Sequence, residues 1–114
     1  MTDESALRGK TCVPCQGGIP RLGLDEALEM AETVAGWDLN DDATRIARTY
    51  AFDEFAEAQA FANAVGDLCE EEFHHADITY GWGYCRVEFH THKIRGLHEN
   101  DFVMAAKTNS LFKG

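Results

Sequence analysis

The chain has 114 residues, of which 45% are hydrophobic and 26% charged, as in an ordinary single globular domain. Twenty acidic residues against ten basic ones give a formal net charge of −10, which disfavours binding to nucleic-acid phosphates or anionic lipid headgroups. No apolar run approaches the ~18 residues of a membrane span, and residues 1–10 lack the apolar core of a signal peptide. We therefore expect a cytoplasmic protein.

The first 23 residues are rich in glycine, proline and polar side chains, a composition typical of a flexible tail. Cys12 and Cys15 form a C-x2-C pair in this segment. A structural zinc site needs a second pair of ligands, and the other two cysteines stand alone. We therefore expect the two cysteines to be free thiols, with a partial metal site as the alternative. Residues 1–23 are expected to form a flexible N-terminal tail, and residues 24–114 a single domain.

A helix is predicted after the tail, with Asp25 as its N-cap and Gly36 just beyond its last turn. Apolar residues recur along this segment at helical spacing, namely Leu24, Leu28, Ala31 and Ala35. Residues 37–40 and 45–51 then predict a β-hairpin. The alternation of the second strand puts Ile46 and Tyr50 on its buried face.

The longest helix signal runs from Phe52 to about Glu72, because apolar side chains form one broad stripe over this range. We expect four residues of this stripe to pack against the sheet, namely Phe55, Phe61, Val65 and Leu68. The helix should end near residues 73–77, before the next strand pair.

A second pair of strands is predicted at residues 78–80 and 84–92. In the longer strand, Val87 and Phe89 alternate towards the core together with Cys85. His90 and His92 alternate to the opposite face, so His90 is expected on an exposed polar surface.

The last predicted helix begins at His98, where Leu97 and Phe102 have the spacing of a hydrophobic staple and Asp101 occupies the capping-box position. The element order is helix, hairpin, long helix, strand pair, helix. Strand pairs separated by a helix favour an α+β fold of two layers, with a four-stranded antiparallel sheet and helices packed on one face.

All five histidines lie between residue 74 and the C-terminus. Histidine gives and takes protons near neutral pH, so this uneven placement indicates acid/base chemistry or a histidine metal site. Glu70 and His74 are four residues apart and would share a face if the long helix extended that far. His98 is most simply an N-cap.

The spacing of these residues resembles the signature of the pterin-4a-carbinolamine dehydratases. That signature reads Glu70-x3-His74-His75, then Trp82, then nine residues to His92 and eight to Asp101. Ala76 stands where the family usually has proline. The segment KIRGLHENDFVMAA at residues 93–106 and the segment FANAVG at 61–66 are similar to the bacterial branch that accompanies phenylalanine hydroxylase, as is the N-terminal C-x2-C.

The resemblance implies an enzyme, a hydro-lyase that dehydrates 4a-hydroxytetrahydropterin to quinonoid dihydropterin in tetrahydrobiopterin recycling. It further implies catalysis by His74 and His92 as the acid/base pair, with His75 beside them. Glu70 and Asp101 would orient the imidazoles, and Trp82 would wall the pocket. No metal and no cofactor is expected, since the pterin is the substrate.

The same resemblance implies an aromatic amino-acid hydroxylase as functional partner in phenylalanine metabolism, and assembly as a homodimer or homotetramer. It implies no direct nucleic-acid or membrane partner. Two alternatives stay open at this point. One is a non-enzymatic dimerisation or transcriptional cofactor of the same family, and the other is a small histidine metalloprotein.

Overall fold

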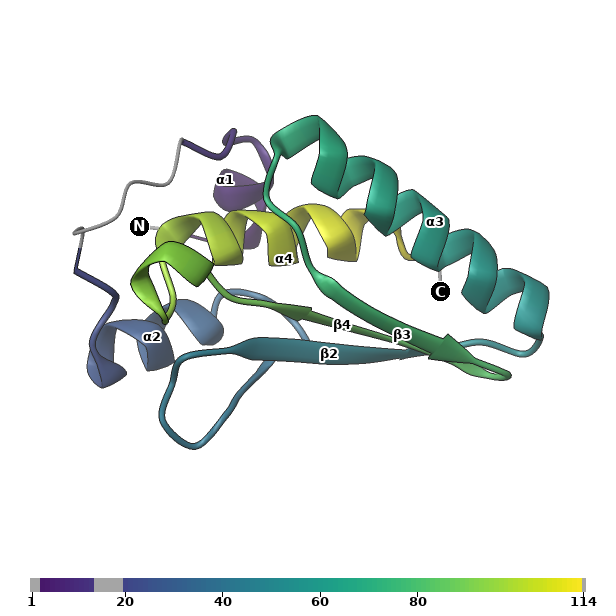
Figure 1. Ribbon diagram of the computed structural model, residues 1–114, viewed down its shortest axis with the longest axis horizontal. Coiled ribbons are helices and arrows are strands. Elements are labelled where there is room, and N and C mark those ends of the chain that lie inside the picture. The colour runs from purple at the N-terminus through teal and green to yellow at the C-terminus, as the bar shows by residue number, and fades with distance from the viewer. Residues whose placement is uncertain (1–2, 14–19, 114) are drawn as a thin grey trace.

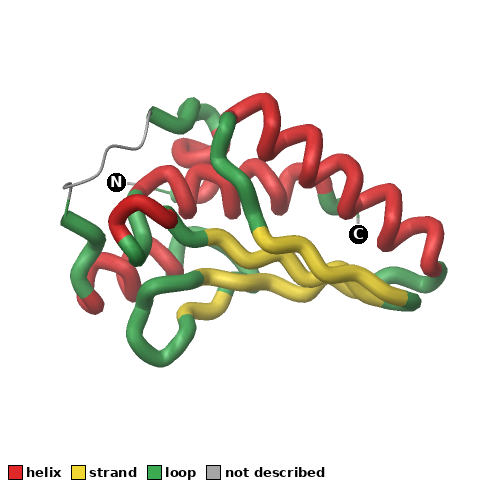
Figure 2. Tube along the Cα trace, viewed as in Figure 1, coloured by secondary structure: helices red, strands yellow, loops and turns green. Residues whose placement is uncertain are grey.

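A computed structural model describes residues 3–13 and 20–113 of the chain. Its elements in chain order are α1 (Glu4–Arg8), α2 (Leu24–Ala31), β1 (Asp38–Leu39), β2 (Ile46–Ala51), α3 (Phe55–Glu72), β3 (Asp77–Gly81), β4 (Tyr84–Phe89), the 3-10 turn η1 (His92–Ile94) and α4 (Glu99–Leu111). The four strands form one antiparallel sheet in the order β1-β2-β4-β3. Helices α3 and α4 cover one face of it (Figures 1 and 2), which confirms the predicted α+β class.

Both predicted hairpins form, and their residues alternate as expected. In the central pair, Ile46 lies opposite Phe89 and Tyr50 lies opposite Cys85. Each of these four side chains is at most 1% exposed, because the residues facing α3 and α4 make the core.

The apolar stripe of α3 is buried at Phe61 and Val65, which are 6% and 0% exposed, as predicted. The prediction is wrong for Phe55, which is 47% exposed. Helix α3 begins at Phe55 and not at Phe52, so Phe55 lies in the first turn, where its ring contacts the Tyr80 ring at a centroid distance of 5.6 Å. It therefore packs on the edge strand β3 and not inside the core.

Helix α1 corrects the prediction of a flexible tail for residues 4–8. Asp3 caps this helix by accepting a hydrogen bond from the Ala6 N–H at 2.8 Å, and Leu7 is fully buried. The helix packs against α4, far from it in sequence (Figure 1). The sequence pattern did not predict this helix, because a five-residue helix with one buried leucine is too short to show an apolar stripe. Of the two cysteines in the C-x2-C pair, Cys12 lies within the described residues and Cys15 lies outside them.

Helix α2 is shorter than predicted and ends at Ala31, before Ala35. Its N-cap is Gly23 and not Asp25, because the Glu26 carboxylate accepts a hydrogen bond from the Gly23 N–H at 3.0 Å. Gly36 has φ +82°, the left-handed conformation that favours glycine.

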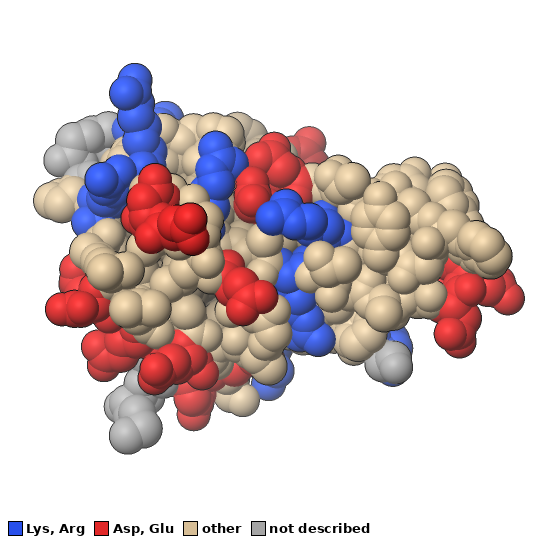
Figure 3. All heavy atoms as spheres, turned by 90° about the horizontal axis from the view of Figure 1, so that it is seen from below, with Lys and Arg blue, Asp and Glu red and all other residues tan. Residues whose placement is uncertain are grey.

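The face of the sheet away from α3 and α4 carries basic and acidic side chains next to one another (Figure 3). Arg45 contacts Glu88 at 2.9 Å, and Arg86 contacts the same carboxylate at 3.1 Å. The two guanidinium groups hold the pKa of Glu88 below its usual value, although partial burial acts in the opposite direction. Within the described residues, no helix is long and apolar enough to cross a membrane.

Candidate active site

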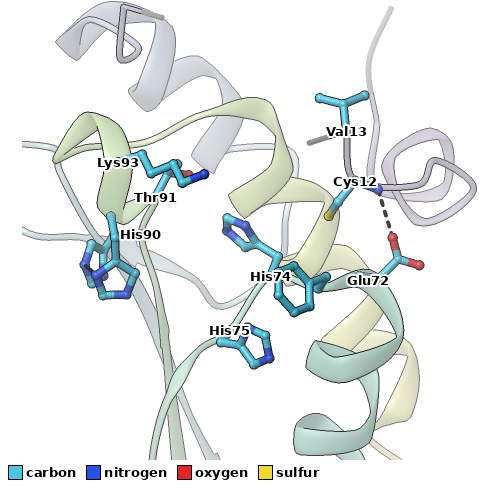
Figure 4. Close-up of a pocket in the computed structure, with 10 residues that line it drawn as sticks. Cys12, Val13, Glu72, His74, His75, His90, Thr91 and Lys93 are labelled. Atoms are coloured by element: carbon cyan, nitrogen blue, oxygen red, sulfur yellow. Dashed lines mark hydrogen bonds between the residues drawn. The ribbon is translucent and has the colours of Figure 1, made fainter. Parts of the chain in front are cut away.

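A cavity of about 490 Å³ opens where the C-terminal end of α3, the end of β4 and the loop around η1 meet. Its lining residues are Cys12, Val13, Glu72, Phe73, His74, His75, His90, Thr91, His92 and Lys93. Figure 4 shows His74 between the N-terminal residues on one side and His90 on the other. The three imidazoles to which the resemblance assigns catalysis, those of His74, His75 and His92, all line this cavity.

The sharp end of α3 separates the two adjacent histidines. Phe73 adopts the left-handed conformation with φ 51°, and the His74 N–H donates to the Cys69 carbonyl at 3.1 Å. This closes the helix without a proline at position 76. Because the chain reverses direction here, His74 is buried while His75 stays exposed.

His74 is held by Asp101 from the first turn of α4. Its Nε2 lies 2.6 Å from Asp101 Oδ1, and Asp101 is fully buried. The other carboxylate oxygen accepts hydrogen bonds from the Thr91 hydroxyl at 2.7 Å and from the His98 N–H at 2.9 Å. Since a carboxylate only accepts, Nε2 of His74 carries a proton and Nδ1 has the lone pair when the ring is neutral.

The capping predictions for α4 are confirmed by the same contacts. His98 is the N-cap, and its side chain accepts a hydrogen bond from the Asn100 N–H at 3.1 Å. Asp101 occupies the capping-box position, so one carboxylate both caps the helix and orients His74.

Glu70 contacts His75 and not His74. Glu70 Oε2 lies 2.5 Å from His75 Nε2, and the two side chains are 74% and 48% exposed. The expectation that Glu70 and His74 share a helix face is wrong, because α3 ends at Glu72. Water screens an exposed pair of this kind, so its main effect is to restrict the orientation of the His75 ring.

His90 corrects another expectation, since it lies in the cavity wall and not on an exposed strand face. Strand β4 ends at Phe89, and His90 Nε2 lies 3.1 Å from His92 Nδ1. Burial lowers the pKa of His90 below 6.5, and the nearby positive charges of His92 and Arg45 lower it further. The pair therefore places two imidazoles within hydrogen-bond distance of each other in the cavity wall.

A closed loop presents His92 to the cavity. The Thr91 N–H donates to the Gly96 carbonyl at 2.8 Å, and the 3-10 turn η1 lies between these two residues. Arg95 takes the left-handed conformation with φ 51°, and its carbonyl accepts a hydrogen bond from Arg21 at 2.9 Å. His92 thus lies in a loop fixed at both ends, beyond the strand in which the sequence placed it.

The structure does not bring Trp82 to this cavity. Trp82 lies in the turn between β3 and β4, where its side chain is 78% exposed. This turn is at the opposite end of β4 from His90, so the strand's length separates them.

Several lining residues were absent from the predicted site. Thr91 stands between two histidines, and its place in the H-x-H segment was a usable signal. Lys93 follows directly. Nothing in the sequence pattern pointed to Cys12 and Val13, because their approach depends on how the N-terminal segment docks.

Among residues 3–13 and 20–113, no group of three or more His, Cys, Asp or Glu side chains is arranged to hold a metal ion. Cys69 and Cys85 form no disulfide with another cysteine of the described residues.

Comparison with protein families gives a match over residues 20–111 to the model of the family described as pterin 4 alpha carbinolamine dehydratase. The match covers most of the chain and all the imidazoles of the cavity. It begins after the N-terminal residues that contribute Cys12 and Val13.

Close relatives match over nearly the whole chain. A Methylococcus capsulatus protein named "Putative pterin-4-alpha-carbinolamine dehydratase" is 58% identical over 109 residues, covering 96% of each chain. A Cupriavidus pinatubonensis protein named "Putative pterin-4-alpha-carbinolamine dehydratase 1" is 50% identical over 108 residues, covering 95% of this chain and 93% of its own.

A crystal structure described as a "transcriptional coactivator/pterin dehydratase" from Brucella melitensis superposes with a TM-score of 0.75 at 28% identity. The superposition covers 80% of this chain and 97% of that one. The shared fold is therefore the sheet with its covering helices.

Proposed function

This chain belongs to the pterin-4a-carbinolamine dehydratase family and is accordingly a hydro-lyase, and we propose that its cavity dehydrates a 4a-hydroxytetrahydropterin by histidine acid/base catalysis. The product would be the quinonoid dihydropterin. The cavity volume of about 490 Å³ falls in the range of roughly 300–1,000 Å³ typical of small-molecule sites.

One observation carries this proposal. His74, His75 and His92 line one cavity, and each has a polar group that orients its ring: Asp101, Glu70 and His90 respectively. Dehydration needs a proton donor and a proton acceptor at the same pH, and imidazoles in different surroundings can supply both near neutrality.

The reaction can be written with these groups. An imidazolium donates a proton to the 4a-hydroxyl, and the C4a–O bond breaks with its electron pair leaving on water. The N5 lone pair forms the N5=C4a double bond, and a neutral imidazole accepts the N5 proton. We assign the two proton transfers to His74 and His92, and binding and orientation of the pterin to His75.

The surrounding residues would tune this pair. The buried Asp101 carboxylate, 2.6 Å from His74 Nε2, fixes the orientation of the His74 ring. The neutral His90 beside His92 gives the second imidazole a hydrogen-bond partner. Positioned general acid/base groups contribute about 10²- to 10⁴-fold each.

The reaction also points to a partner enzyme and a cellular location. Aromatic amino-acid hydroxylases release the carbinolamine, so we propose such an enzyme, phenylalanine hydroxylase in particular, as the functional partner in tetrahydrobiopterin recycling. Within the described residues, the buried Cys69 and Cys85 form no disulfide, which supports a reducing, cytoplasmic location.

We further propose assembly as a homodimer or homotetramer. Four aromatic side chains are exposed at the end of the sheet away from the cavity, namely Phe55, Tyr80, Trp82 and Tyr84. An apolar patch of this kind supports a protein interface, and Trp82 would take part in it. Light scattering of the purified protein tests this assembly.

A coactivator role is the second candidate, since the Brucella protein is described by both functions. The imidazole cavity favours the enzyme, because an interaction surface alone needs no oriented proton donors and acceptors.

The direct test is to follow dehydration of a freshly generated 4a-carbinolamine by absorbance. Acceleration over the uncatalysed reaction, with a bell-shaped pH dependence and no loss after chelation, is expected. Activity that disappears on chelation and returns with one metal ion would contradict this mechanism and favour the metalloprotein alternative. No acceleration at any pH would leave the coactivator role as the better explanation.

A further inference from the structure

The N-terminal arm, defined here as residues 3–13, crosses α4 and reaches the cavity with its last two residues (Figures 1 and 4). Leu7 anchors one end in the core. Lys107 of α4 donates to the Arg8 carbonyl at 3.0 Å, and Lys10 contacts Glu99 at 3.1 Å. The arm is therefore bound along α4.

The Asn100 side chain holds the end of the arm by pairing with both the backbone N–H and the backbone carbonyl of Val13. The Val13 N–H donates to Asn100 Oδ1 at 3.0 Å, and Asn100 Nδ2 donates to the Val13 carbonyl at 2.8 Å. Asn100 is only 3% exposed. An amide side chain that pairs with both groups of one backbone residue fixes its position as a neighbouring strand would.

A second contact comes from a different helix. The Cys12 N–H donates to Glu72 Oε1 at 2.8 Å, and the other oxygen of this carboxylate lies 3.8 Å from Lys107 Nζ. Glu72 is the last residue of α3, directly before the turn that presents His74. The arm is thus tied to both helices that carry the site.

The part of the arm that lines the cavity offers a thiol and an isopropyl group, and no imidazole or carboxylate. The Val13 side chain is 55% exposed and lies on the far side of His74 from His90 in Figure 4. The isopropyl group of Val13 can bury ligand surface and has no proton to transfer, so it affects binding and not the chemical step.

We propose that the N-terminal arm is a wall of the pterin site, held in place by Asn100, and that it sets the affinity for the pterin and not the rate of dehydration. This rests on the proposed function for the identity of the ligand. The family match begins at residue 20, so the wall is an addition to the family's common core. The Methylococcus relative covers 96% of the chain and so includes most of the arm.

The test is Asn100→Ala, with Asn63→Ala as the matched control on an exposed position of α3. Releasing two hydrogen bonds should raise KM about five- to tenfold and leave kcat within about twofold. The Kd for biopterin, measured by its fluorescence, should rise by the same factor. Hydrogen exchange at the Cys12 and Val13 amides should accelerate in Asn100→Ala and stay unchanged in Asn63→Ala.

Glu72→Ala provides a second route to the same release, since it removes the acceptor for the Cys12 N–H without replacing any residue of α4. It should raise KM and Kd in the same direction. The proposal is overturned if the two amides exchange faster while KM and Kd stay within twofold of wild type. It is also overturned if exchange at these amides does not change, or if kcat falls as much as kcat/KM.

Failure of the proposed function would look different. A wild-type protein that binds biopterin without dehydrating the carbinolamine would remove the enzyme assignment, and the Kd and exchange measurements would still test the arm. If the wild-type protein catalyses dehydration and neither variant changes KM, only the proposed role of the arm is contradicted.

Discussion

Helix α4 carries two polar clusters, and they differ in what they can do. The Asp101 cluster consists of Asp101, His74, Thr91 and the His98 N–H at the start of the helix. The Asn109 cluster lies two turns later, where Asn109 Oδ1 accepts hydrogen bonds from Tyr50 at 2.5 Å, Trp37 at 2.9 Å and Arg48 at 2.8 Å.

Both clusters satisfy buried polar atoms from three or more segments of the chain. The Asp101 cluster borders a cavity and contains an imidazole. The Asn109 cluster contains no imidazole, and burial raises the pKa of its Tyr50 hydroxyl above the ordinary value of 10. The Asp101 cluster is therefore suited to proton transfer, whereas the Asn109 cluster only connects β2 and Trp37 with α4.

The largest expected effect distinguishes the two clusters by activity. His74→Ala should lower the turnover of carbinolamine dehydration by about 10²-fold or more, because it removes a positioned proton donor or acceptor. His74→Gln should lose as much, although its amide can still donate to Asp101. Asn109→Ala should stay within about threefold of wild type, since no titrating group is lost. Equal losses in His74→Ala and Asn109→Ala would mean that the Asp101 cluster has no special catalytic role.

For the free energy of unfolding, we expect Asn109→Ala to have a larger effect than His74→Ala. Asn109→Ala leaves three donors without their shared acceptor and should lower the free energy of unfolding by about 2–4 kcal/mol in denaturant titrations. The control Asn63→Ala should stay within about 0.5 kcal/mol of wild type. A loss below about 1 kcal/mol in Asn109→Ala would show that water replaces these hydrogen bonds easily.

The pH dependence of stability should sharpen the contrast. The pKa of His90 is lowered on folding, so between that pKa and 6.5 the unfolded chain binds more protons. Stability therefore rises with pH across this window and falls as the pH drops through it. His90→Gln should flatten this slope in unfolding titrations between pH 5 and 7, whereas Asn109→Ala should lower stability equally throughout. An unchanged slope in His90→Gln would contradict the pKa shift.

The smallest expected effect lies inside the Asp101 cluster. Thr91→Val is nearly isosteric and removes one of the hydrogen bonds that Asp101 accepts. We expect a loss of about 1 kcal/mol in stability and a two- to fivefold drop in turnover, because the other contacts still hold the carboxylate. A drop as large as that of His74→Ala would assign Thr91 a direct contact with substrate.

Local patterns in the sequence sufficed for most of the elements. Alternation along residues 46–50 and 85–89 predicted the buried face of each central strand, and the capping box at His98 and Asp101 predicted where α4 begins. These features depend on neighbours within a few residues, so periodicity and capping rules capture them. The spacing of the histidines likewise pointed to one cleft.

Contacts between distant segments were decided only by the tertiary structure. Helical spacing pointed from Glu70 to His74, but the reversal at Phe73 turned His75 towards Glu70 and left His74 to Asp101. Trp82 matched the spacing of the signature, yet the length of β4 keeps it away from the cavity.

The N-terminal arm shows the physical reason for this division most clearly. Its docking depends on Leu7 finding a gap in the core and on Asn100 meeting the backbone of Val13 across 87 residues of sequence. Backbone hydrogen bonds of this kind leave no mark in side-chain periodicity, because any residue except proline offers the same N–H and carbonyl. Local patterns thus predicted most of the elements and the available chemistry, whereas tertiary packing decided which imidazole meets which carboxylate and which residues wall the cavity.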